Sequence, residues 1–375
     1  MNILFVGTPA TPYGNRACDV KLAAFANIVA KEHNVTILNR YSPIKDRKDI
    51  CLNKRVCIKE IINKHNSLSL FFFLLSVLIE PFVIFDLNRK KKIDIIQIYS
   101  GHYLDFVFYK SIAFLIGAKV IYQYDEYALE KERRSGYYKW NSRRVDLKGP
   151  KLWDGVVCIS DFLQEHAQKV NPNIVSMKLT PICDFSSFEQ IHPENNRGKY
   201  LLFCGSIGYY EVVDIIINSY RKSAISNSHD LILVLSGNEE KVESFKQKNT
   251  DITVLSGLPY DTLLSLYKGA VGLLIPLRNT IEDIARFPNK ICEYLAAKGL
   301  VITTKYGEMP NYFKDGYNAL VAEDFTVESI TSKLDWLDDN LDKVDNLKET
   351  AYKELYTTFD QDSNFEAVND FLSKL

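Results

Sequence analysis

Short apolar runs, each of strand length, alternate with helix-length segments along most of the chain. These runs are residues 2–7, 34–38, 93–99, 119–124 and 155–159, and then 200–204, 231–236, 252–255, 271–276 and 300–304. Between the first two runs, Leu22, Phe25 and Val29 recur at the spacing of one helix face. Alternation of this kind predicts parallel sheets with helices packed on both faces.

Residues 181–199 break the alternation, because they are enriched in Pro, Asn and Ser and show no periodicity. A chain of 375 residues is long enough for two domains, each with its own core. We therefore predict an α/β protein with two Rossmann-like, doubly wound parallel-sheet domains, residues 1–184 and 185–359.

The most apolar stretch, residues 68–87, is followed by the basic residues 89–92. Its length approaches the roughly 20 residues that a membrane span needs, but Glu80 and Pro81 interrupt it. Three alternatives remain open: a helix buried against the first sheet, an amphipathic helix that touches lipid beside its basic end, or a membrane span.

Positive and negative charges are divided unevenly along the chain, although the net charge is −1. Residues 1–184 carry 27 Lys or Arg and 18 Asp or Glu, a balance of +9, whereas residues 185–375 carry 19 and 29, a balance of −10. The basic half could face an anionic membrane surface, where each basic residue contributes on the order of 1 kcal/mol. A hydrophobic content of 46% with 25% charged residues excludes a disordered or fibrous protein.

The seven cysteines are scattered without a C-x-x-C pair, which indicates reduced thiols. Because the chain opens into an apolar run without a secretion signal, we expect a cytoplasmic protein, with contact to the cytoplasmic face of a membrane left open. There is no G-x-G-x-x-G motif and no cluster of His or carboxylates at metal-ligand spacing. Neither a dinucleotide cofactor nor a metal is expected.

The stretch RFPNKICEYLAAKG, residues 286–299, lies between two of the apolar runs. Pro288 suits the first turn of a helix that starts near Asn289. Gly299 would close this helix about three turns later, where a left-handed residue is expected.

Lys290 and Glu293 share a face of this predicted helix. A helix N-terminus favours a phosphate, and Lys290 adds a full positive charge beside it. Glu293 can accept two hydrogen bonds from a vicinal diol such as a ribose. The pair therefore predicts a nucleotide clamp, and the alternative is an ordinary surface Lys–Glu pair on an amphipathic helix.

The run Phe-Pro-Asn-Lys-x-x-Glu-Tyr-Leu-Ala-Ala-x-Gly, followed by an apolar strand and then Gly307 and Glu308, resembles the donor-site signature of retaining glycosyltransferase family 4. The resemblance implies the GT-B fold, with an active site in the cleft between two domains and a helix at about 360–375 that packs back on the first domain.

The activity that this resemblance implies is transfer of a hexose-type sugar from a nucleotide diphosphate sugar to a glycan or a lipid-linked saccharide. Configuration would be retained, and the setting would be synthesis of bacterial surface polysaccharide or glycoconjugate. The expected partners are this donor and acceptor, with a membrane surface as a further possibility and nucleic acid excluded.

The resemblance also assigns roles to individual residues. The expected donor-binding residues are Gly14, Asn15, Gly205, Ser206, Gly237, Leu258, Arg278, Arg286, Asn289, Lys290 and Glu293. The expected catalytic residues are His102, Asp125 and Glu282.

Two positions depart from the family pattern. The Arg and Lys that commonly follow the strand ending at Gly205 are absent, and Ala285 stands where a second Glu is expected. Arg278, Arg286 and Lys290 could together bind the diphosphate instead. Two alternatives therefore stay open: a nucleotide-sugar epimerase on the same fold, and a non-catalytic subunit that has lost donor chemistry.

Overall fold

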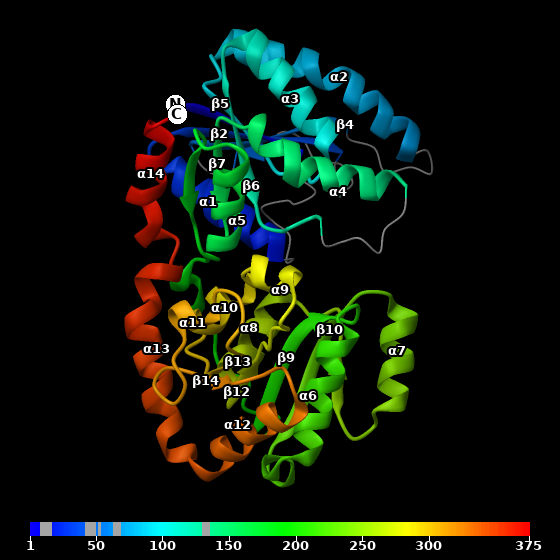
Figure 1. The fold of residues 1–375 in the computed structure, drawn as a ribbon, viewed down its shortest axis with the longest axis vertical. Coiled ribbons are helices and arrows are strands. Elements are labelled where there is room, and N and C mark those ends of the chain that lie inside the picture. Colours follow the sequence, from blue (N-terminus) through cyan, green and yellow to red (C-terminus); the bar gives the residue numbers. More distant parts are fainter. Residues whose placement is uncertain (8–16, 42–49, 52–53, 63–68, 130–135) are drawn as a thin grey trace. The chain divides into compact units, whose positions relative to one another are not determined.

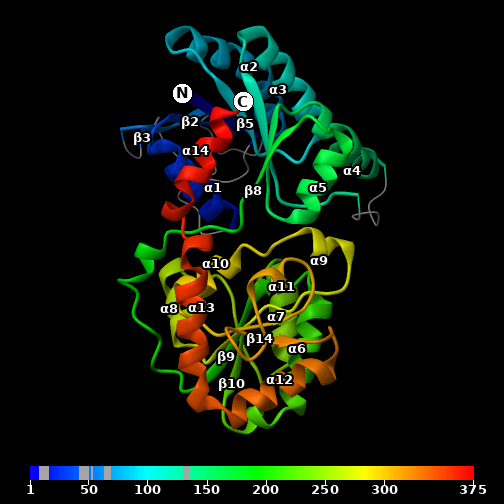
Figure 2. The same cartoon turned by 60° about the vertical axis from the view of Figure 1, so that its left-hand side comes forward.

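The computed structural model of the protein describes residues 1–7, 17–41, 50–51, 54–62, 69–129 and 136–375. The chain divides into two compact units, of which unit 1 comprises Met1–Thr180 with Asn364–Leu375 and unit 2 comprises Pro181–Ser363. Each unit is built on its own sheet with helices on both faces (Figures 1 and 2). The predicted donor residues Gly14 and Asn15 lie outside the described residues.

The sheet of unit 1 has the strand order β3-β4-β2-β1-β5-β6-β7-β8. Its strands are β1 (Asn2–Val6), β2 (Asn34–Tyr41), β3 (Ile50–Cys51), β4 (Val56–Ile62), β5 (Ile95–Ile98), β6 (Lys119–Tyr124), β7 (Gly155–Cys158) and β8 (Val175–Lys178). All neighbouring strands run parallel except the short edge strand β3, which pairs antiparallel with β4. The central strands β5 and β7 are buried throughout, as parallel strands covered on both faces usually are.

The helices of unit 1 are α1 (Ala17–Ala30), α2 (Ser69–Lys90), α3 (Tyr103–Ile116), α4 (Tyr137–Lys148), α5 (Asp161–Val170) and α14 (Phe365–Ser373). The C-terminal helix α14 packs beside α1 and β8 (Figures 1 and 2). Asn369 Oδ1 of α14 forms a hydrogen bond of 2.9 Å with His33 Nε2. The last helix of the chain is therefore part of unit 1.

Helix α2 covers the apolar stretch and packs on β2 and β4. Glu80, which interrupts the stretch, is fully buried and accepts hydrogen bonds from Arg40 Nε at 2.6 Å and the Tyr109 hydroxyl at 2.7 Å. Pro81 lies within the helix. The alternative of a helix buried against the sheet is correct for one face of α2, and the other face is exposed at Leu78 and Phe82. No helix in the described part of the chain is long and apolar enough to cross a membrane.

The expectation of reduced cysteines is wrong for Cys57, which is disulfide-bonded. The antiparallel pairing of β3 with β4 places the backbone of Cys51 opposite Cys57, a register that the sequence pattern does not reveal. The cysteines at 158, 183, 204 and 292 are free thiols, as expected.

The sheet of unit 2 is parallel throughout, with the strand order β11-β10-β9-β12-β13-β14. Its strands are β9 (Tyr200–Ser206), β10 (Asp230–Ser236), β11 (Thr253–Leu255), β12 (Gly272–Leu274), β13 (Val301–Thr304) and β14 (Leu320–Ala322). Its helices are α6 (Tyr210–Lys222), α7 (Glu239–Lys248), α8 (Tyr260–Gly269), α9 (Ile281–Ala285), α10 (Lys290–Ala296), α11 (Met309–Tyr312), α12 (Val327–Asp339) and α13 (Val344–Phe359). One face of this sheet packs through Leu201, Leu233 and Ile302 against α6 and α12.

The end of α10 differs from the sequence prediction. The helix has seven residues, fewer than the three turns expected, and Pro288 precedes its N-cap Asn289. The left-handed residue is Lys298, with a φ of 54°, and not Gly299. Lys298 N–H donates to Leu295 O and Gly299 N–H donates to Tyr294 O, each at 2.9 Å, which is the Schellman pattern. Gly299 is required by close packing, because a Cβ there would clash with Leu273 Cδ1.

Replacing Lys298 with Gly should raise the free energy of unfolding by about 0.5–1 kcal/mol, because glycine adopts a positive φ without the steric cost of a Cβ. Urea unfolding measures the change. Lys353→Gly in the middle of α13, where Lys353 is also exposed, is the matched control and should lower stability by about 1 kcal/mol. A loss of stability in Lys298→Gly would contradict the prediction.

Candidate active site

The candidate site lies at the carboxyl ends of the parallel strands of unit 2. Ser206 ends β9, and the segments after β10, β11 and β12 contain Gly237, Leu258 and Arg278. Ligands of open α/β sheets bind outside the carboxyl ends of the strands. The predicted donor residues of unit 2 thus come to one edge of its sheet, although they are up to 88 residues apart in sequence, between Gly205 and Glu293.

Glu293 lies inside unit 2, with 5% of its surface exposed. Its Oε1 accepts a hydrogen bond of 2.8 Å from the Tyr260 hydroxyl. Burial raises the pKa of Glu293 above its ordinary value of 4.5, although the hydrogen bond from Tyr260 and the charge of Lys290 act in the opposite direction. The alternative of an ordinary surface Lys–Glu pair is therefore wrong.

Lys290 begins α10 and is half-buried. It forms no ion pair with any residue that the structure describes, and its charge acts on both Glu293 and the thiol of Cys204 at the end of β9. Because α10 is only seven residues long, the side-chain charge of Lys290 is a stronger reason to expect an anion here than the helix N-terminus.

Asp283 of α9 holds both predicted phosphate-binding arginines. Its buried carboxylate accepts hydrogen bonds from the backbone N–H of Arg278 at 2.8 Å and from Arg278 Nε at 2.9 Å. Arg286 Nη2 lies 2.7 Å from the other oxygen. Burial alone would raise the pKa of Asp283, but the hydrogen bonds from Arg278 and the charge of Arg286 outweigh it and lower the pKa below 3.8.

Further carboxylates surround Arg278. Its Nη1 lies 3.1 Å from Glu211 Oε2, and its Nη2 lies 3.3 Å from Glu282 Oε2. With Asp283, three carboxylates therefore face the two guanidinium groups of Arg278 and Arg286. The expected diphosphate contact by these arginines would have to compete with these ion pairs, whereas Lys290 has no ion-pair partner in the part of the chain that the structure describes.

Two buried polar atoms beside this cluster have no hydrogen-bond partner among the described residues: Arg286 Nε and Asn289 Oδ1. Buried polar atoms are nearly always paired. The Arg286 side chain is otherwise fixed, since its Nη1 donates to the Tyr209 hydroxyl at 2.7 Å. Both atoms are thus candidates for contact with a ligand.

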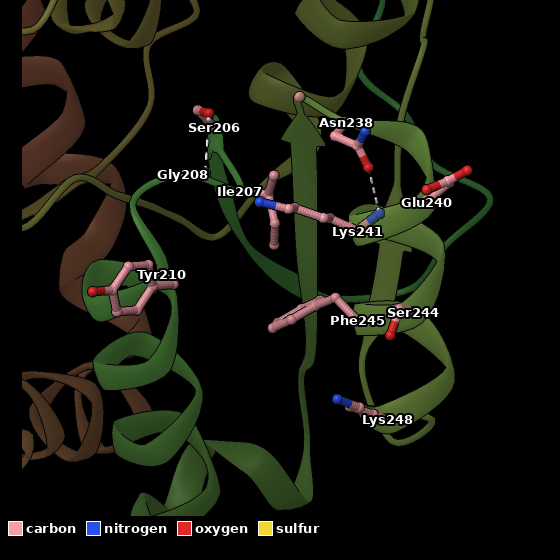
Figure 3. A pocket seen from close by; sticks show the side chains of 11 residues that line it. Ser206, Ile207, Gly208, Tyr210, Asn238, Glu240, Lys241, Ser244, Phe245 and Lys248 are labelled. Carbon is pink, nitrogen blue, oxygen red and sulfur yellow. Dashed lines mark hydrogen bonds between the residues drawn. The ribbon is translucent and has the colours of Figure 1, made fainter.

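A hollow of about 700 Å³ lies between the ends of β9 and β10 and helix α7 (Figure 3). Ser206 and Gly237, both predicted to bind the donor, line it. The backbone at Gly237 has a φ of 135°, and a Cβ there would lie 2.7 Å from Ile207 Cγ2, so only glycine fits. Lys241 extends from α7 toward Ile207 and places a positive charge in the hollow.

The predicted catalytic residues of unit 1 lie at the carboxyl ends of its strands. His102 follows β5 and is exposed, and its ring stacks on that of Tyr137 with centroids 6.3 Å apart. Asp125 follows β6 and forms an ion pair with the buried Lys21. The hydroxyl of Tyr99, near Asp125, is buried without a partner among the described residues.

Sequence reasoning missed the residues that position the others. The sequence pattern assigned no role to the side chains of Asp283, Tyr209 and Tyr260. One local feature of the sequence could have pointed to Asp283. Thr280 is the N-cap of α9, and its hydroxyl accepts a hydrogen bond from the Asp283 N–H, so Asp283 is an acidic residue in the first turn of this helix. Within the described ranges, no group of three or more His, Cys, Asp or Glu side chains is placed to hold a metal ion.

Solved structures define the class of fold. The sucrose-phosphate synthase from Thermosynechococcus elongatus matches with a TM-score of 0.78 and 10% identity, over 100% of this chain and 98% of that chain. HepE from Anabaena in complex with UDP and glucose matches with a TM-score of 0.70 and 13% identity, over 100% of both chains. WaaG, a glycosyltransferase involved in lipopolysaccharide biosynthesis, has a TM-score of 0.64 and 16% identity, over 99% of both chains. The predicted α/β class with the GT-B fold is confirmed.

Residues 184–354 match the family model of glycosyl transferases group 1. This range contains all the predicted donor residues of unit 2. A search of curated proteins found no match. The family match therefore concerns unit 2 alone, and the solved structures define the fold of the whole chain.

Proposed function

We propose that the protein transfers a hexose-type sugar from a nucleotide diphosphate sugar to a hydroxyl of a glycan or lipid-linked saccharide, as a retaining enzyme of glycosyltransferase family 4. The observation that carries the proposal is the pair on α10: a lysine without an ion-pair partner among the described residues and a buried carboxylate one turn further on. Retention is inferred from the resemblance of the α10 motif alone.

Each member of the pair has a distinct task. Glu293 accepts hydrogen bonds from the ribose hydroxyls, and because it is buried, little water competes for them. Lys290 faces the diphosphate, where negative charge develops as the sugar departs, so it stabilises the transition state more than the bound donor. This lysine supplies the positive charge, and the proposal requires no metal or other cofactor.

Two structural relatives support the choice of donor and setting. HepE is described in complex with UDP-glucose, and WaaG takes part in lipopolysaccharide biosynthesis. We therefore place UDP-sugars first among the donors to test, and bacterial surface polysaccharide or glycoconjugate synthesis as the setting, in the cytoplasm. We propose that His102 and Asp125 contact the acceptor. Glu282 would position Arg278 beside the diphosphate through their ion pair.

A panel of UDP-, GDP- and ADP-sugars, with and without a mixed saccharide acceptor, tests this function. NMR of the products should show release of the nucleoside diphosphate only when an acceptor is present, with the anomeric configuration of the donor retained. Conversion of the donor without an acceptor would instead favour the epimerase. Binding of none of the donors by the folded protein would favour the non-catalytic subunit.

Donor binding should weaken as the pH falls from neutral through the raised pKa of Glu293, beginning above pH 4.5. The sign follows because protonation removes the negative charge that accepts hydrogen bonds from the ribose, and a raised pKa brings this loss to a higher pH. Calorimetric titration of UDP-glucose over this range measures it, because its diphosphate is esterified at both ends and does not change charge there, unlike the terminal phosphate of UDP. In Glu293→Gln the affinity should be weaker and independent of pH there, so an unchanged pH dependence would contradict the role of Glu293.

A further inference from the structure

Exposed apolar side chains gather on three neighbouring helices of unit 1. Among the described residues, sixteen large hydrophobic side chains are exposed, and eleven of these belong to α2, α3 and α4. They are Leu74, Leu78, Phe82 and Phe85 of α2, Leu104, Val107, Phe114 and Leu115 of α3, and Tyr137, Tyr138 and Leu147 of α4. The three helices follow one another on the same side of the unit (Figures 1 and 2), and α3 contacts both of the others.

The exposed side chains of α2 form one stripe. Successive members are three or four residues apart, so they stay on one face of the helix. Phe82 is 74% exposed although the opposite face of α2, with Ser76, Glu80 and Ile84, is buried. Phe114 of α3 is 84% exposed. Helices that are apolar on both faces are typical of the interior of a protein or of contact with lipid.

Among the described residues at the end of α2 and along α4, most of the exposed charges are positive. Arg89 and Lys90 end α2, with 83% and 64% of their side chains exposed, and Lys91 and Lys92 follow them. Helix α4 adds further exposed cations, Lys139, Arg143 and Lys148.

Carboxylates on these helices do not offset the cations. The three helices carry Glu80, Asp86, Asp105 and Asp146. Glu80 and Asp146 are fully buried, and Asp105 pairs with Arg40 inside the unit. Asp86 is partly exposed, and it lies within ion-pair distance of both Arg89 and Lys90.

We propose that the exposed face of α2, α3 and α4 docks on an anionic lipid surface. Leu and Phe side chains would enter the acyl boundary, the amphipathic rings of Tyr137 and Tyr138 would lie at headgroup depth, and the lysines and arginines would contact lipid phosphates. A second copy of this chain fits less well, because a two-fold interface would bring the same positive rim together from both sides. A protein partner also fits less well, because lysine is depleted at protein–protein interfaces.

Co-sedimentation with vesicles tests the proposal on the full chain. One set contains phosphatidylcholine alone, and the other contains phosphatidylcholine and phosphatidylglycerol at about 7:3, which gives a strongly negative surface. The protein should bind the second set, bind the first set far less, and leave the vesicles as salt is added. Equal binding to both sets would overturn the role of charge.

Two pairs of substitutions separate the apolar and the basic contribution. Phe82→Ser with Phe114→Ser, and Arg89→Gln with Lys90→Gln, should each weaken partitioning by about tenfold or more. All four side chains are exposed, so the fold is retained, which circular dichroism checks. The matched control is Lys353→Gln with Tyr356→Ser on α13, two exposed residues of unit 2, which should change nothing.

Three results would overturn the proposal: no binding to either vesicle set, binding that neither pair of substitutions reduces, or dimerisation in solution that the phenylalanine pair abolishes. Vesicle binding requires neither donor nor acceptor. The proposal and the glycosyltransferase function can therefore fail independently of each other.

Discussion

Replacing Asp283 with alanine should lower the free energy of unfolding by about 3–5 kcal/mol and weaken donor binding, because Arg278 and Arg286 lose the group that positions them. The substitution leaves the guanidinium groups of Arg278 and Arg286 partly buried without their shared counterion. It also removes the acceptor of the Arg278 backbone N–H. Urea unfolding measures the first effect, and calorimetric titration of UDP measures the second.

The matched control is Glu282→Ala, which removes a carboxylate from the same arginine. The Glu282 side chain is 41% exposed, so its ion pair with Arg278 should contribute at most about 1 kcal/mol. If Asp283→Ala and Glu282→Ala destabilise the protein equally, Asp283 does not organise the site.

The stability contribution of Asp283 should depend on pH with a defined sign. Its pKa is lower in the folded protein than the unfolded value of 3.8. The contribution is therefore complete above about pH 3.8 and is lost as the pH falls through the lowered pKa of the folded state. Asp283→Asn should remove this part of the acid sensitivity, which unfolding at a series of acidic pH values would show.

In unit 1, Arg40→Met should cost about 3–5 kcal/mol of stability at neutral pH, because it leaves the buried carboxylate of Glu80 without its counterion. Replacing Arg40, Glu80 and Tyr109 together in Arg40→Met, Glu80→Leu, Tyr109→Phe should recover part of this loss. Glu80 is then no longer a buried unpaired charge, and the partly buried Asp105 is the one carboxylate that has lost Arg40. Urea unfolding of the single and triple variants measures both. A triple variant less stable than Arg40→Met would contradict the argument.

The pH dependence of Arg40→Met provides a second check. Burial raises the pKa of Glu80 above 4.5 even though Arg40 opposes the shift. A carboxyl with a raised pKa favours the folded state below its unfolded pKa, and this contribution is lost as the pH rises through the folded value. Without Arg40 the shift should be larger, so Arg40→Met should be less destabilising near pH 4.5 than at neutral pH.

Most strands and helices could be predicted because the spacing of apolar residues within each element shows which of its faces is buried. This spacing can be read from a few consecutive residues without knowledge of the rest of the fold. Leu22, Phe25 and Val29 are all buried, as the spacing indicated. Details of backbone geometry were less accessible. The left-handed residue is Lys298, and Gly299 is instead needed because it packs closely against Leu273. A glycine needed for close packing and a glycine needed for a positive φ look the same in the sequence.

The candidate site could be predicted only in part. The α10 motif identified Lys290 and Glu293, but not that Glu293 is buried behind Tyr260, 33 residues earlier. The arginines were predicted without their partners, because Tyr209 lies 77 residues from Arg286 and Glu211 lies 67 residues from Arg278. Such pairings depend on the strand order of the sheet, which places the end of β9 beside the end of β12.

The sequence also could not predict which side chains of the apolar stretch are exposed. Residues 68–87 could be buried, lipid-facing or membrane-spanning, and hydropathy does not separate the first two. The alternation of buried Glu80 and Ile84 with exposed Leu78 and Phe82 becomes visible only when α2 is placed on its sheet.

The central claim is that Lys290 and Glu293 bind the nucleotide diphosphate, and calorimetric titration of UDP into the wild type, Lys290→Ala and Glu293→Ala tests it most directly. Lys353→Ala is the control, since Lys353 is an exposed lysine of α13 in unit 2 that pairs with Glu349. We expect each site variant to bind UDP at least about tenfold more weakly, a loss of about 1.4 kcal/mol, while the control is unchanged. Wild-type affinity for UDP in both Lys290→Ala and Glu293→Ala would contradict the account.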